Sequence, residues 1–376
     1  MHNIKLAILH PGSYLNTETF IQKHIDNLPF DKITIFGGLI PHNMTGENND
    51  FIPLSFLEKL KRTFTPSLNS NVNDFKERRL KYFLQKYKIE VVLAEYVITA
   101  SYVFHICKEL NIPIIATGLG YELSIHKVIS DNKTRYQNLF KHCSSIIVVA
   151  KFMEKVLVEL GYNQNKIFYS PAGASFDFCE IKPDYSSKKI LAIGRFVEKK
   201  APHLTILAFW KVLNEVPDAQ LIFAGDGPLL NFCIDLVKAL NIKQHVSFVG
   251  KINQEEHMHY LSECRLFVQH SKIAADGDSE GTPVAIVEAS SAGLAVVSTM
   301  HAGIPDVIVN NETGYLVREG DVDTMSQSII KLLKDSSLAK KMGEAGKKNI
   351  KANFTLDKHI AILTEKIKYA AQNRSI

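Results

Sequence analysis

The sequence predicts an α/β protein built from two doubly wound domains, and three observations lead to this class. The chain has 376 residues, which is enough for two domains of ordinary size. Short runs of apolar residues alternate with amphipathic segments of helical period along most of it. These runs form two series, separated by the stretch "YSPAGASFDFCEIKPDYSSKK", where Pro, Gly, Ser and charged residues replace the periodicity.

Five strands are expected in the first series, each a nearly continuous apolar run: "IKLAILH", "KITIFGG", "VVLAE", "IPIIATG" and "SIIVVA". Strands of this kind are typical of a parallel sheet that helices cover on both faces. Helical patterns lie between these strands, near residues 18–28, 75–88, 99–110 and 151–160.

Six strands are expected in the second series: "KILAIGR", "AQLIFAGDG", "VSFVG", "LFVQHS", "AVVST" and "GYLV". The helices between them fall near 203–215, 228–240, 254–263 and 283–292. We therefore expect Rossmann-like domains at 1–180 and 181–357, with a final helix at 358–376 that packs back on the first domain. In such sheets the ligand site lies beyond the carboxyl ends of the strands, so polar motifs at strand ends are the functional candidates.

The composition is that of an ordinary soluble globular protein, with 46% hydrophobic and 22% charged residues. No run approaches the ~20 apolar residues that span a bilayer. The start "MHNIKLAILHPG" reaches a Pro-Gly turn without a cleavage site, so it predicts a first strand rather than a signal peptide. The five cysteines are far apart and form no C-x-x-C motif, which argues against disulfides and zinc and for a reducing cytoplasm.

A basic segment runs from Lys59 to Lys88, with nine Lys or Arg residues against two acidic ones. Apolar residues such as Phe64, Tyr82 and Phe83 are interleaved with these charges. Two interpretations are open: a solvated helix face with a packed apolar side, or a basic amphipathic surface that rests on anionic lipid. Nucleic-acid binding is not expected, because no known reader motif accompanies the segment.

Two cations follow the first strand of the second series. In "AIGRFVEKKAP", Arg195 comes directly after the strand and Lys200 lies five residues later, before the next helix. Arg offers a planar fork and Lys a point charge, so the pair can bind a diphosphate from two sides. The alternative is a surface loop that is merely basic.

The turn "FAGDGP" also follows a strand, and its Gly225 and Gly227 allow close approach of the backbone. It matches neither G-x-G-x-x-G nor the Walker motif with its lysine, so it is a weak phosphate-loop candidate. Tight turn chemistry explains it equally well.

The stretch "EGTPVAIVEASSAG" gives the strongest local signal. Thr282 suits an N-cap and Pro283 the first helical position, so a helix is expected from about 283 to 292. The free amides at its start form an anion site. Glu280 precedes the helix and Glu288 lies inside it, so both carboxylates can accept hydroxyl hydrogen bonds at one site. A helix start that simply carries acidic residues is the structural alternative.

The motifs "DGD" (Asp276–Asp278) and "DVD" (Asp321–Asp323) spell the D-x-D that holds a metal in some sugar-transferring enzymes. Arg, Lys and a helix start already supply positive charge, so we expect turns here and no metal. His270 ends a strand, and as a lone histidine it is expected to be structural.

Taken together, these stretches resemble glycosyltransferase family 4, the retaining nucleotide-sugar transferases of GT-B fold. The segments "GRFVEKKAP", "FAGDGPLL", "VSFVGKI", "SEGTPVAIVEASSAGLAVVSTMHAGIPDVIVNNETGYLVREGD" and "FTL" occur in that family's order and spacing. "TETFI" and "AADGDSEGTP" are similar to the colanic-acid type of polysaccharide glycosyltransferase. The likeness is strong in the C-terminal half and patchy in the N-terminal half.

The resemblance implies a role for each residue of the candidate site. Arg195 and Lys200 bind the donor diphosphate, and Glu288 takes the ribose hydroxyls of the nucleotide. Glu280 lies against the donor sugar and forms the catalytic set with the two cations. The remaining donor-binding residues contribute mainly backbone: Gly12, Gly225, Gly281, Thr282 and Pro283.

One departure from the family pattern stands out. The family commonly has an "H-G-x-D" stretch after the fourth strand, and "ATGLGYELS" has Leu119 in the His place and Glu122 in the Asp place. A polar contact to the sugar or its phosphate is thereby lost, which leaves the identity of the sugar open.

We therefore expect a glycosyltransferase that moves a sugar from a UDP- or GDP-linked donor to a saccharide acceptor, with retention and without a cofactor. The acceptor is expected to be a lipid-linked intermediate of a surface polysaccharide. The protein is expected in the cytoplasm, either free or peripheral on the inner face of the cell membrane. The alternatives are a nucleotide-sugar epimerase or phosphorylase of the same fold, or a donor-binding homologue without turnover.

Overall fold

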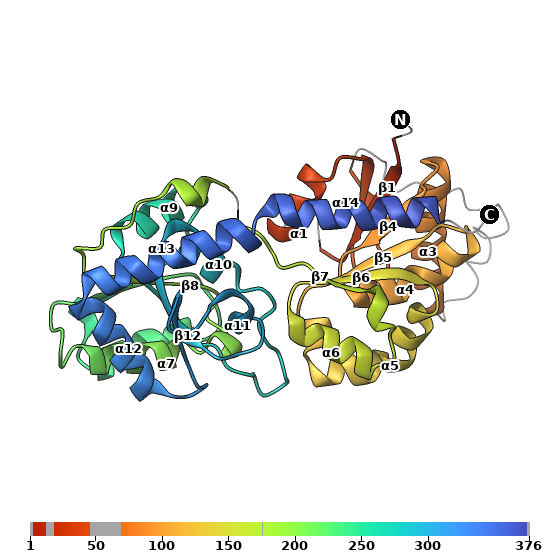
Figure 1. Ribbon diagram of the computed structural model, residues 1–376. Coiled ribbons are helices and arrows are strands. Elements are labelled where there is room, and N and C mark those ends of the chain that lie inside the picture. The colour runs from red at the N-terminus through yellow and green to blue at the C-terminus, as the bar shows by residue number, and fades with distance from the viewer. Residues whose placement is uncertain (1–2, 13–18, 46–68, 175, 374–376) are drawn as a thin grey trace.

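The computed structural model describes residues 3–12, 19–45, 69–174 and 176–373 of the chain. These residues form two α/β domains that lie side by side, each with a central sheet covered by helices (Figure 1). The two doubly wound domains that the sequence predicts are therefore present, and the fold class is confirmed.

Within the described residues, the first sheet has seven strands in the order β3-β2-β1-β4-β5-β6-β7, and only β3 is antiparallel to its neighbour. The strands are β1 (Lys5–His10), β2 (Asp31–Phe36), β3 (Asn43–Met44), β4 (Val91–Ala94), β5 (Ile114–Gly118), β6 (Cys143–Val148) and β7 (Ile167–Tyr169). The helices are α1 (Thr19–Asn27), α3 (Asn69–Lys86), α4 (Val97–Glu109), α5 (His126–Phe140) and α6 (Lys151–Glu159).

The second sheet has six parallel strands among the described residues, in the order β10-β9-β8-β11-β12-β13. They are β8 (Lys189–Ile193), β9 (Gln220–Ala224), β10 (Val246–Gly250), β11 (Leu266–Gln269), β12 (Ala295–Thr299) and β13 (Gly314–Val317). The helices are α7 (Pro202–Val212), α8 (Leu230–Ala239), α9 (Gln254–Glu263), α10 (Val284–Ala292), α11 (Ile304–Val307), α12 (Val322–Lys334) and α13 (Ser336–Asn353).

Each sheet buries both of its faces, which is why its strands are continuous apolar runs. In β1, Ala7 and Leu9 belong to one core, whereas Leu6 and Ile8 belong to the core on the other face. Successive side chains of a strand point to opposite faces, so every position of such a strand must be apolar.

The chain crosses between the domains twice, and the crossing segments contact each other. The N–H of Ala174 donates to the carbonyl oxygen of Phe354 at 3.1 Å. A Cβ atom on Gly173 would lie 2.2 Å from the carbonyl carbon of Thr355, so only glycine fits there. Because Ala174 already packs in a core of the second domain, we propose a domain boundary near Gly173, earlier than the expected residue 180.

The last helix, α14 (Leu356–Gln372), follows the second crossing and lies along the first domain (Figure 1). Its Leu363, Ile367 and Ala370 are buried in the core that contains Leu6. One helix from the C-terminal end of the chain thus covers a face of the N-terminal sheet.

Several elements were absent from the sequence prediction, namely β3, β7, α5, α11, α12 and α13. Helix α13 contains Gly343 and Gly346, which lower its helix propensity. Gly343 is explained by packing, because a Cβ there would lie 1.8 Å from the carbonyl oxygen of Gly293. The close approach of α13 to the end of α10 therefore requires a glycine.

The described part of the basic segment supports the packed-face interpretation. On α3, Leu80, Phe83 and Leu84 are at most 2% exposed, so these side chains pack in the core and are not available to contact lipid. Arg79 is also buried, with its guanidinium carbon 5.4 Å from the centre of the Phe83 ring. Residues 59–68 of this segment lie outside the described residues.

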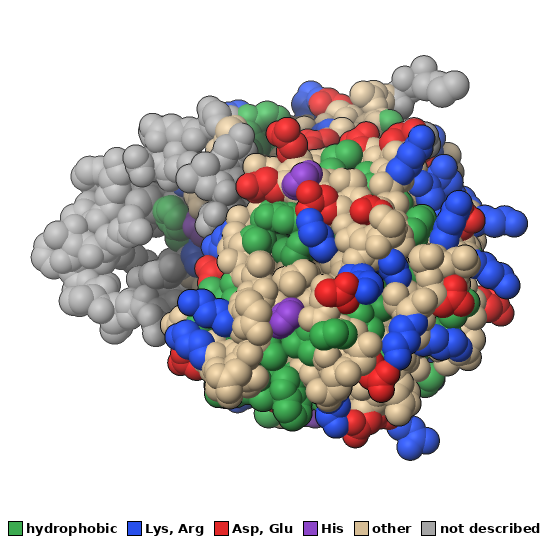
Figure 2. All heavy atoms as spheres, turned by 90° about the vertical axis from the view of Figure 1, so that its left-hand side faces the viewer, with side chains coloured by type: hydrophobic (Ala, Val, Ile, Leu, Met, Phe, Trp, Pro, Cys, Tyr) green, Lys and Arg blue, Asp and Glu red, His purple; other side chains and the backbone are tan. Residues whose placement is uncertain are grey.

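Charge is well mixed on the outer face of the second domain. Figure 2 shows Lys and Arg side chains interspersed with Asp and Glu over this face, in keeping with a net charge of only +5. Among the described residues, no helix combines the length and the apolar character needed to span a bilayer.

Candidate functional site

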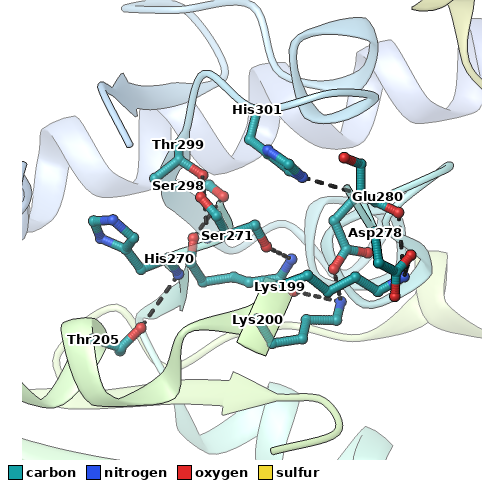
Figure 3. Close-up of polar contacts among 12 residues, drawn as sticks. Lys199, Lys200, Thr205, His270, Ser271, Asp278, Glu280, Ser298, Thr299 and His301 are labelled. Carbon is teal, nitrogen blue, oxygen red and sulfur yellow. Dashed lines mark hydrogen bonds and ion pairs between the residues drawn. The ribbon is translucent and has the colours of Figure 1, made fainter. Parts of the chain in front are cut away.

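Two of the predicted site residues, Lys200 and Glu280, meet beyond the carboxyl ends of β8 and β11. Lys200 comes from the loop after β8 and Glu280 from the segment before α10 (Figure 3). Gln269, the last residue of β11, joins them. A small cavity of about 20 Å³ lies beside them, and Arg195, Lys200, Thr205 and Gln269 are among its lining residues. The rule that ligands bind beyond the strand ends thus points to this group of side chains.

Lys200 is paired within this group, whereas Arg195 is exposed. The Nζ atom of Lys200 lies 3.2 Å from Oε1 of Glu280 and donates to Oε1 of Gln269, also at 3.2 Å. Arg195 has no ion pair with any other described residue. The two predicted cations are therefore on one loop, but only Lys200 already has an anionic partner.

Glu280 is a buried carboxylate, with a side chain only 7% exposed. Burial by itself raises the pKa of this carboxyl, but the charges of Lys200 and Lys199 outweigh it, and the pKa lies below its ordinary value. Glu280 is therefore ionised at neutral pH.

Thr282 does not have the predicted role at the start of α10. The helix begins at Val284, and Pro283 occupies the N-cap position without a side-chain cap. The Thr282 hydroxyl instead donates to the carbonyl oxygen of Val149 at 2.6 Å and accepts the N–H of Ala172 at 3.0 Å. The N-cap prediction is wrong because the first domain supplies this hydroxyl with better partners.

The start of α10 offers backbone donors. Among the described residues, no acceptor is found for the amides of Gly281, Thr282, Val284 and Ala285. A helix of nine residues with free amides at its start has the partial positive charge of an anion site.

The two domains contact each other directly beside this helix start. The N–H of Ser279 donates to the hydroxyl of Ser124 at 3.3 Å. A Cβ on Gly281 would lie 2.6 Å from the carbonyl oxygen of Leu119, so the absence of a side chain allows the contact. Leu119, which stands in the family's His place, thus lies against the candidate site through its backbone.

Glu122 stabilises the loop that carries Leu119. Its carboxylate accepts the N–H groups of Leu119 at 2.7 Å and Gly120 at 3.0 Å, and its side chain is fully buried. Glu122 therefore acts within the first domain and does not replace the polar contact that a histidine would make.

Glu288 lies in a different environment from Glu280. Burial raises the pKa of its carboxyl to about 7, although the charge of Lys23 on α1 acts to lower it. Its nearest basic neighbour is His257, with Nδ1 3.8 Å from Oε2. Burial lowers the pKa of His257 to about 4, so this histidine is neutral at pH 7 and provides no counter-charge.

The backbone amides of Gly225 and Gly227 in the "FAGDGP" turn already donate hydrogen bonds within the protein. The N–H of Gly225 donates to the carbonyl oxygen of Gly250 at 2.7 Å, and that of Gly227 donates to Oδ1 of Asp226 at 2.7 Å. A Cβ on Gly225 would lie 2.0 Å from the carbonyl oxygen of Gly194. These contacts favour the turn interpretation, and a donor-binding role for Gly225 stays a proposal.

Gly12 follows β1 at the carboxyl end of the first sheet, and its carbonyl oxygen accepts the N–H of Gly37 at 3.1 Å. Its position at a strand end is compatible with the role that the family resemblance implies. That role also stays a proposal.

The acidic residues of both D-x-D motifs have protein partners. Asp278 pairs with Lys199 at 2.9 Å, and Oδ1 of Asp276 accepts the N–H of Asp278 at 2.9 Å. Asp321 caps α12, and Asp323 forms an ion pair with Lys211. No cluster of three or more metal-ligating side chains occurs in the part of the chain that the structure describes.

Three site residues were missed by the sequence analysis. Lys199 bonds Asp278 and the carbonyl oxygen of Ser279, Gln269 accepts from Lys200, and His301 accepts the N–H of Glu280 at 3.2 Å. Of these three, only Lys199 could have been found from the sequence, because it is adjacent to Lys200 on the same loop. The other two are brought in by neighbouring strands.

His270 is structural, as predicted. Its Nε2 atom accepts the N–H of Gly320 at 2.8 Å, and its Nδ1 atom lies 3.4 Å from the sulfur of Met325. Burial lowers its pKa to about 4. A neutral, fully bonded ring of this kind has no free atom for a ligand.

Two doubly wound domains whose strand-end loops meet define the GT-B class. Residues 177–349 match the family model described as "Glycosyl transferases group 1". This segment, which lies in the second domain, is similar to that family, and the predicted resemblance is confirmed.

Two relatives show the same similarity. An amylovoran biosynthesis glycosyltransferase of Erwinia amylovora is 28% identical over 245 residues, which cover 64% of this chain and 60% of that protein. A putative colanic acid biosynthesis glycosyltransferase of Escherichia coli is 28% identical over 213 residues, 56% of this chain and 52% of its own length. The chain thus spans between half and two thirds of the length of these relatives.

A solved structure extends the likeness of fold to the whole chain. The Anabaena protein HepE, crystallised in complex with UDP and glucose, superposes with a TM-score of 0.77. The superposition covers 97% of this chain and 99% of that one, at 14% sequence identity. At this identity the comparison establishes the fold alone.

Proposed function

We propose that this chain transfers a sugar from a nucleoside diphosphate sugar to a saccharide acceptor, with retention at the anomeric carbon. The bond from the anomeric carbon to the diphosphate oxygen breaks, a bond to an acceptor oxygen forms, and the proton of the acceptor hydroxyl passes to the departing diphosphate. The observation that carries the proposal is the Lys200–Glu280 ion pair beside the free amides at the start of α10.

These groups suit the charge that develops when the nucleoside diphosphate departs. Lys200 and the α10 amides are held at the strand ends, and the exposed Arg195 lies on the same loop as Lys200, so together they can stabilise leaving-group charge by several kcal/mol. No metal is required for this stabilisation, and metal independence is part of the proposal.

The two glutamates divide the donor between them in this proposal. Glu280 is held ionised by lysines and accepts from the sugar hydroxyls. Glu288 has a raised pKa, and among the described residues no Lys or Arg lies within ion-pair distance of it, so it gains most when two ribose hydroxyls donate to it. Support for the division comes from the contrasting environments of Glu280, just before α10, and Glu288, within it.

The acceptor is proposed from the relatives and from the placement of Leu119. The two relatives named above are described as enzymes of amylovoran and colanic acid biosynthesis. We infer a related acceptor, a saccharide on a lipid carrier, bound on the first-domain side where Leu119 meets Gly281.

A lipid-linked acceptor requires approach to a membrane surface. We propose that the protein is cytoplasmic and peripheral, with surface cations of α3 facing anionic lipid. Lys76, Arg78 and Lys86 remain at the protein surface, whereas Arg79 is buried and does not contribute. The contact is electrostatic, because the apolar side of α3 packs in the core.

Transfer and hydrolysis measured with a panel of UDP- and GDP-sugars test the proposal. We expect one donor to be used, and Lys200→Ala to lower turnover by ~100-fold or more. Lys188→Ala is the matched control, because it removes a lysine that pairs with Asp218 on the surface. Wild-type protein that binds nucleotide but neither transfers nor hydrolyses any donor would support the binding-only alternative instead.

A further inference from the structure

The backbone of Glu280 is held on both sides by the turn that follows β12. Its N–H donates to Nε2 of His301 at 3.2 Å, and its carbonyl oxygen accepts the N–H of Gly303 at 3.3 Å. His301 is fully buried, and Figure 3 shows its ring pointing toward Glu280. A histidine from a neighbouring strand end thus fixes the main chain of a predicted catalytic residue.

Glu319 determines which nitrogen of the His301 ring carries the proton. Its Oε1 atom lies 2.6 Å from Nδ1 of His301. A carboxylate can only accept, so the proton of the ring must be on Nδ1. The unprotonated Nε2 is then the acceptor that the N–H of Glu280 requires.

The second oxygen of Glu319 reaches a third segment. Its Oε2 atom accepts the N–H of Ile273 at 3.0 Å, in the loop after β11. Because β11, β12 and β13 are neighbours in the sheet, one carboxylate connects the loops that follow all three strands. The loop that leads into Glu280 is therefore held at Ile273 and again at Glu280 itself.

The turn that contains His301 is also tightly packed. Ala302 has a φ of 45°, in the left-handed region that non-glycine residues rarely adopt. A Cβ on Gly303 would lie 2.1 Å from the carbonyl oxygen of Gly281. The turn therefore lies directly against Glu280 and Gly281, with little freedom to shift.

We propose that His301 is a positioning residue for Glu280 and that Glu319 orients it. The inference rests on the proposed function, in which the Glu280 carboxylate contacts the donor sugar beside Lys200. An error of ~1 Å in the placement of such a group can cost ~100-fold in rate. Neither residue contacts the donor in this scheme, so the nucleotide should bind without them.

The test compares His301→Leu with His301→Gln. Leucine has a similar size but no acceptor, whereas the glutamine amide oxygen can take the place of Nε2. We expect His301→Leu to lower kcat by ~10- to 100-fold while the Kd for nucleoside diphosphate changes less than threefold. His301→Gln should recover most of kcat, and His245→Leu at the opposite end of the sheet should change nothing.

Glu319→Gln tests the orienting role separately. An amide has only one acceptor oxygen, so it can bond either His301 or Ile273 but not both. We expect an intermediate loss of kcat, with nucleotide binding unchanged. If His301→Leu keeps wild-type kcat, or weakens nucleotide binding as much as turnover, the positioning role is wrong.

Hydrogen exchange of the peptide that contains Glu280 gives a readout independent of activity. The Glu280 amide should exchange faster in His301→Leu than in the wild type, and His301→Gln should restore its protection. If the wild type proves inactive with every donor, this exchange pattern still supports the positioning contact and only the proposed function fails. Equal exchange in all three proteins overturns the inference.

Discussion

The Nζ atom of Lys200 lies 3.2 Å from the Oε1 atom of Glu280, and this ion pair joins the loop after β8 to the segment before α10. A diphosphate that binds Lys200 must compete with Glu280 for the ammonium group. The same pair holds the carboxylate ionised, because Lys200 and Lys199 outweigh the effect of burial on its pKa.

Glu280→Gln should therefore separate binding from turnover. Removal of the competing charge is expected to tighten nucleoside diphosphate binding by up to ~5-fold, equivalent to ~1 kcal/mol. Transfer should fall by ~100-fold or more, because an interaction with the donor sugar is lost. Calorimetry and initial-rate kinetics on the same preparation measure both, and a large loss of nucleotide affinity would contradict the sugar assignment.

Nucleotide binding should release protons through Glu288. Its pKa is about 7, so the carboxyl is half protonated at pH 7. Two hydroxyl donors favour the charged form and lower that pKa, so up to ~0.5 proton should leave on binding at pH 7. Calorimetry in buffers of different ionisation enthalpy measures this number.

Glu288→Gln provides the control for that experiment. The variant should bind nucleotide ~1–3 kcal/mol more weakly and release no proton. Unchanged affinity in a folded Glu288→Gln protein would rule out the ribose assignment.

Stability should fall in acid, partly through His270. Burial lowers its pKa to about 4, so between pH 6.5 and 4 the unfolded chain binds a proton that the folded one does not. The contribution of the neutral ring to the free energy of unfolding is fully present above pH 6.5. About 3 kcal/mol of this contribution is lost by pH 4. Urea denaturation curves at pH 7 and pH 4.5 should show a shallower acid decline for His270→Gln, and equal declines would contradict the assignment.

Activity should survive removal of divalent metal ions. Asp276 and Asp278 are engaged by backbone and by Lys199, and the positive charge of the site comes from protein. Assays in EDTA should retain the full rate. Loss of activity in EDTA with recovery on addition of manganese would instead favour the metal interpretation of the "DGD" motif.

Anionic liposomes should bind the protein at low salt and release it at roughly half-molar salt, because screening shortens the reach of surface cations. Sedimentation should be weak with neutral liposomes. Replacement of Lys76, Arg78 and Lys86 by Ser should reduce binding while transfer to a soluble acceptor analogue persists. Arg79 is left in place because it is buried and its loss would disturb the fold. Failure of the wild type to sediment with anionic liposomes would leave α3 as a solvated face.

The sequence by itself determined the two α/β domains, because a strand that is buried on both faces must be a continuous apolar run. Leu6 to Leu9 show this directly, alternating between two cores. It also placed Arg195, Lys200, Glu280 and Glu288 near strand ends or a helix start, since these positions follow local signals. Helix α10 was expected at 283–292 and found at Val284–Ala292.

Only the tertiary structure decided which partners these residues have. Nothing local indicates that Thr282 bonds Val149 and Ala172, since those residues belong to the other domain. His301 and Glu319 likewise reach Glu280 from separate strand ends. Hydrophobic periodicity repeats every few residues, so it can be recognised from the sequence alone. A hydrogen bond between distant loops depends on the order of strands in the sheet and on the contact between domains, which no local pattern encodes.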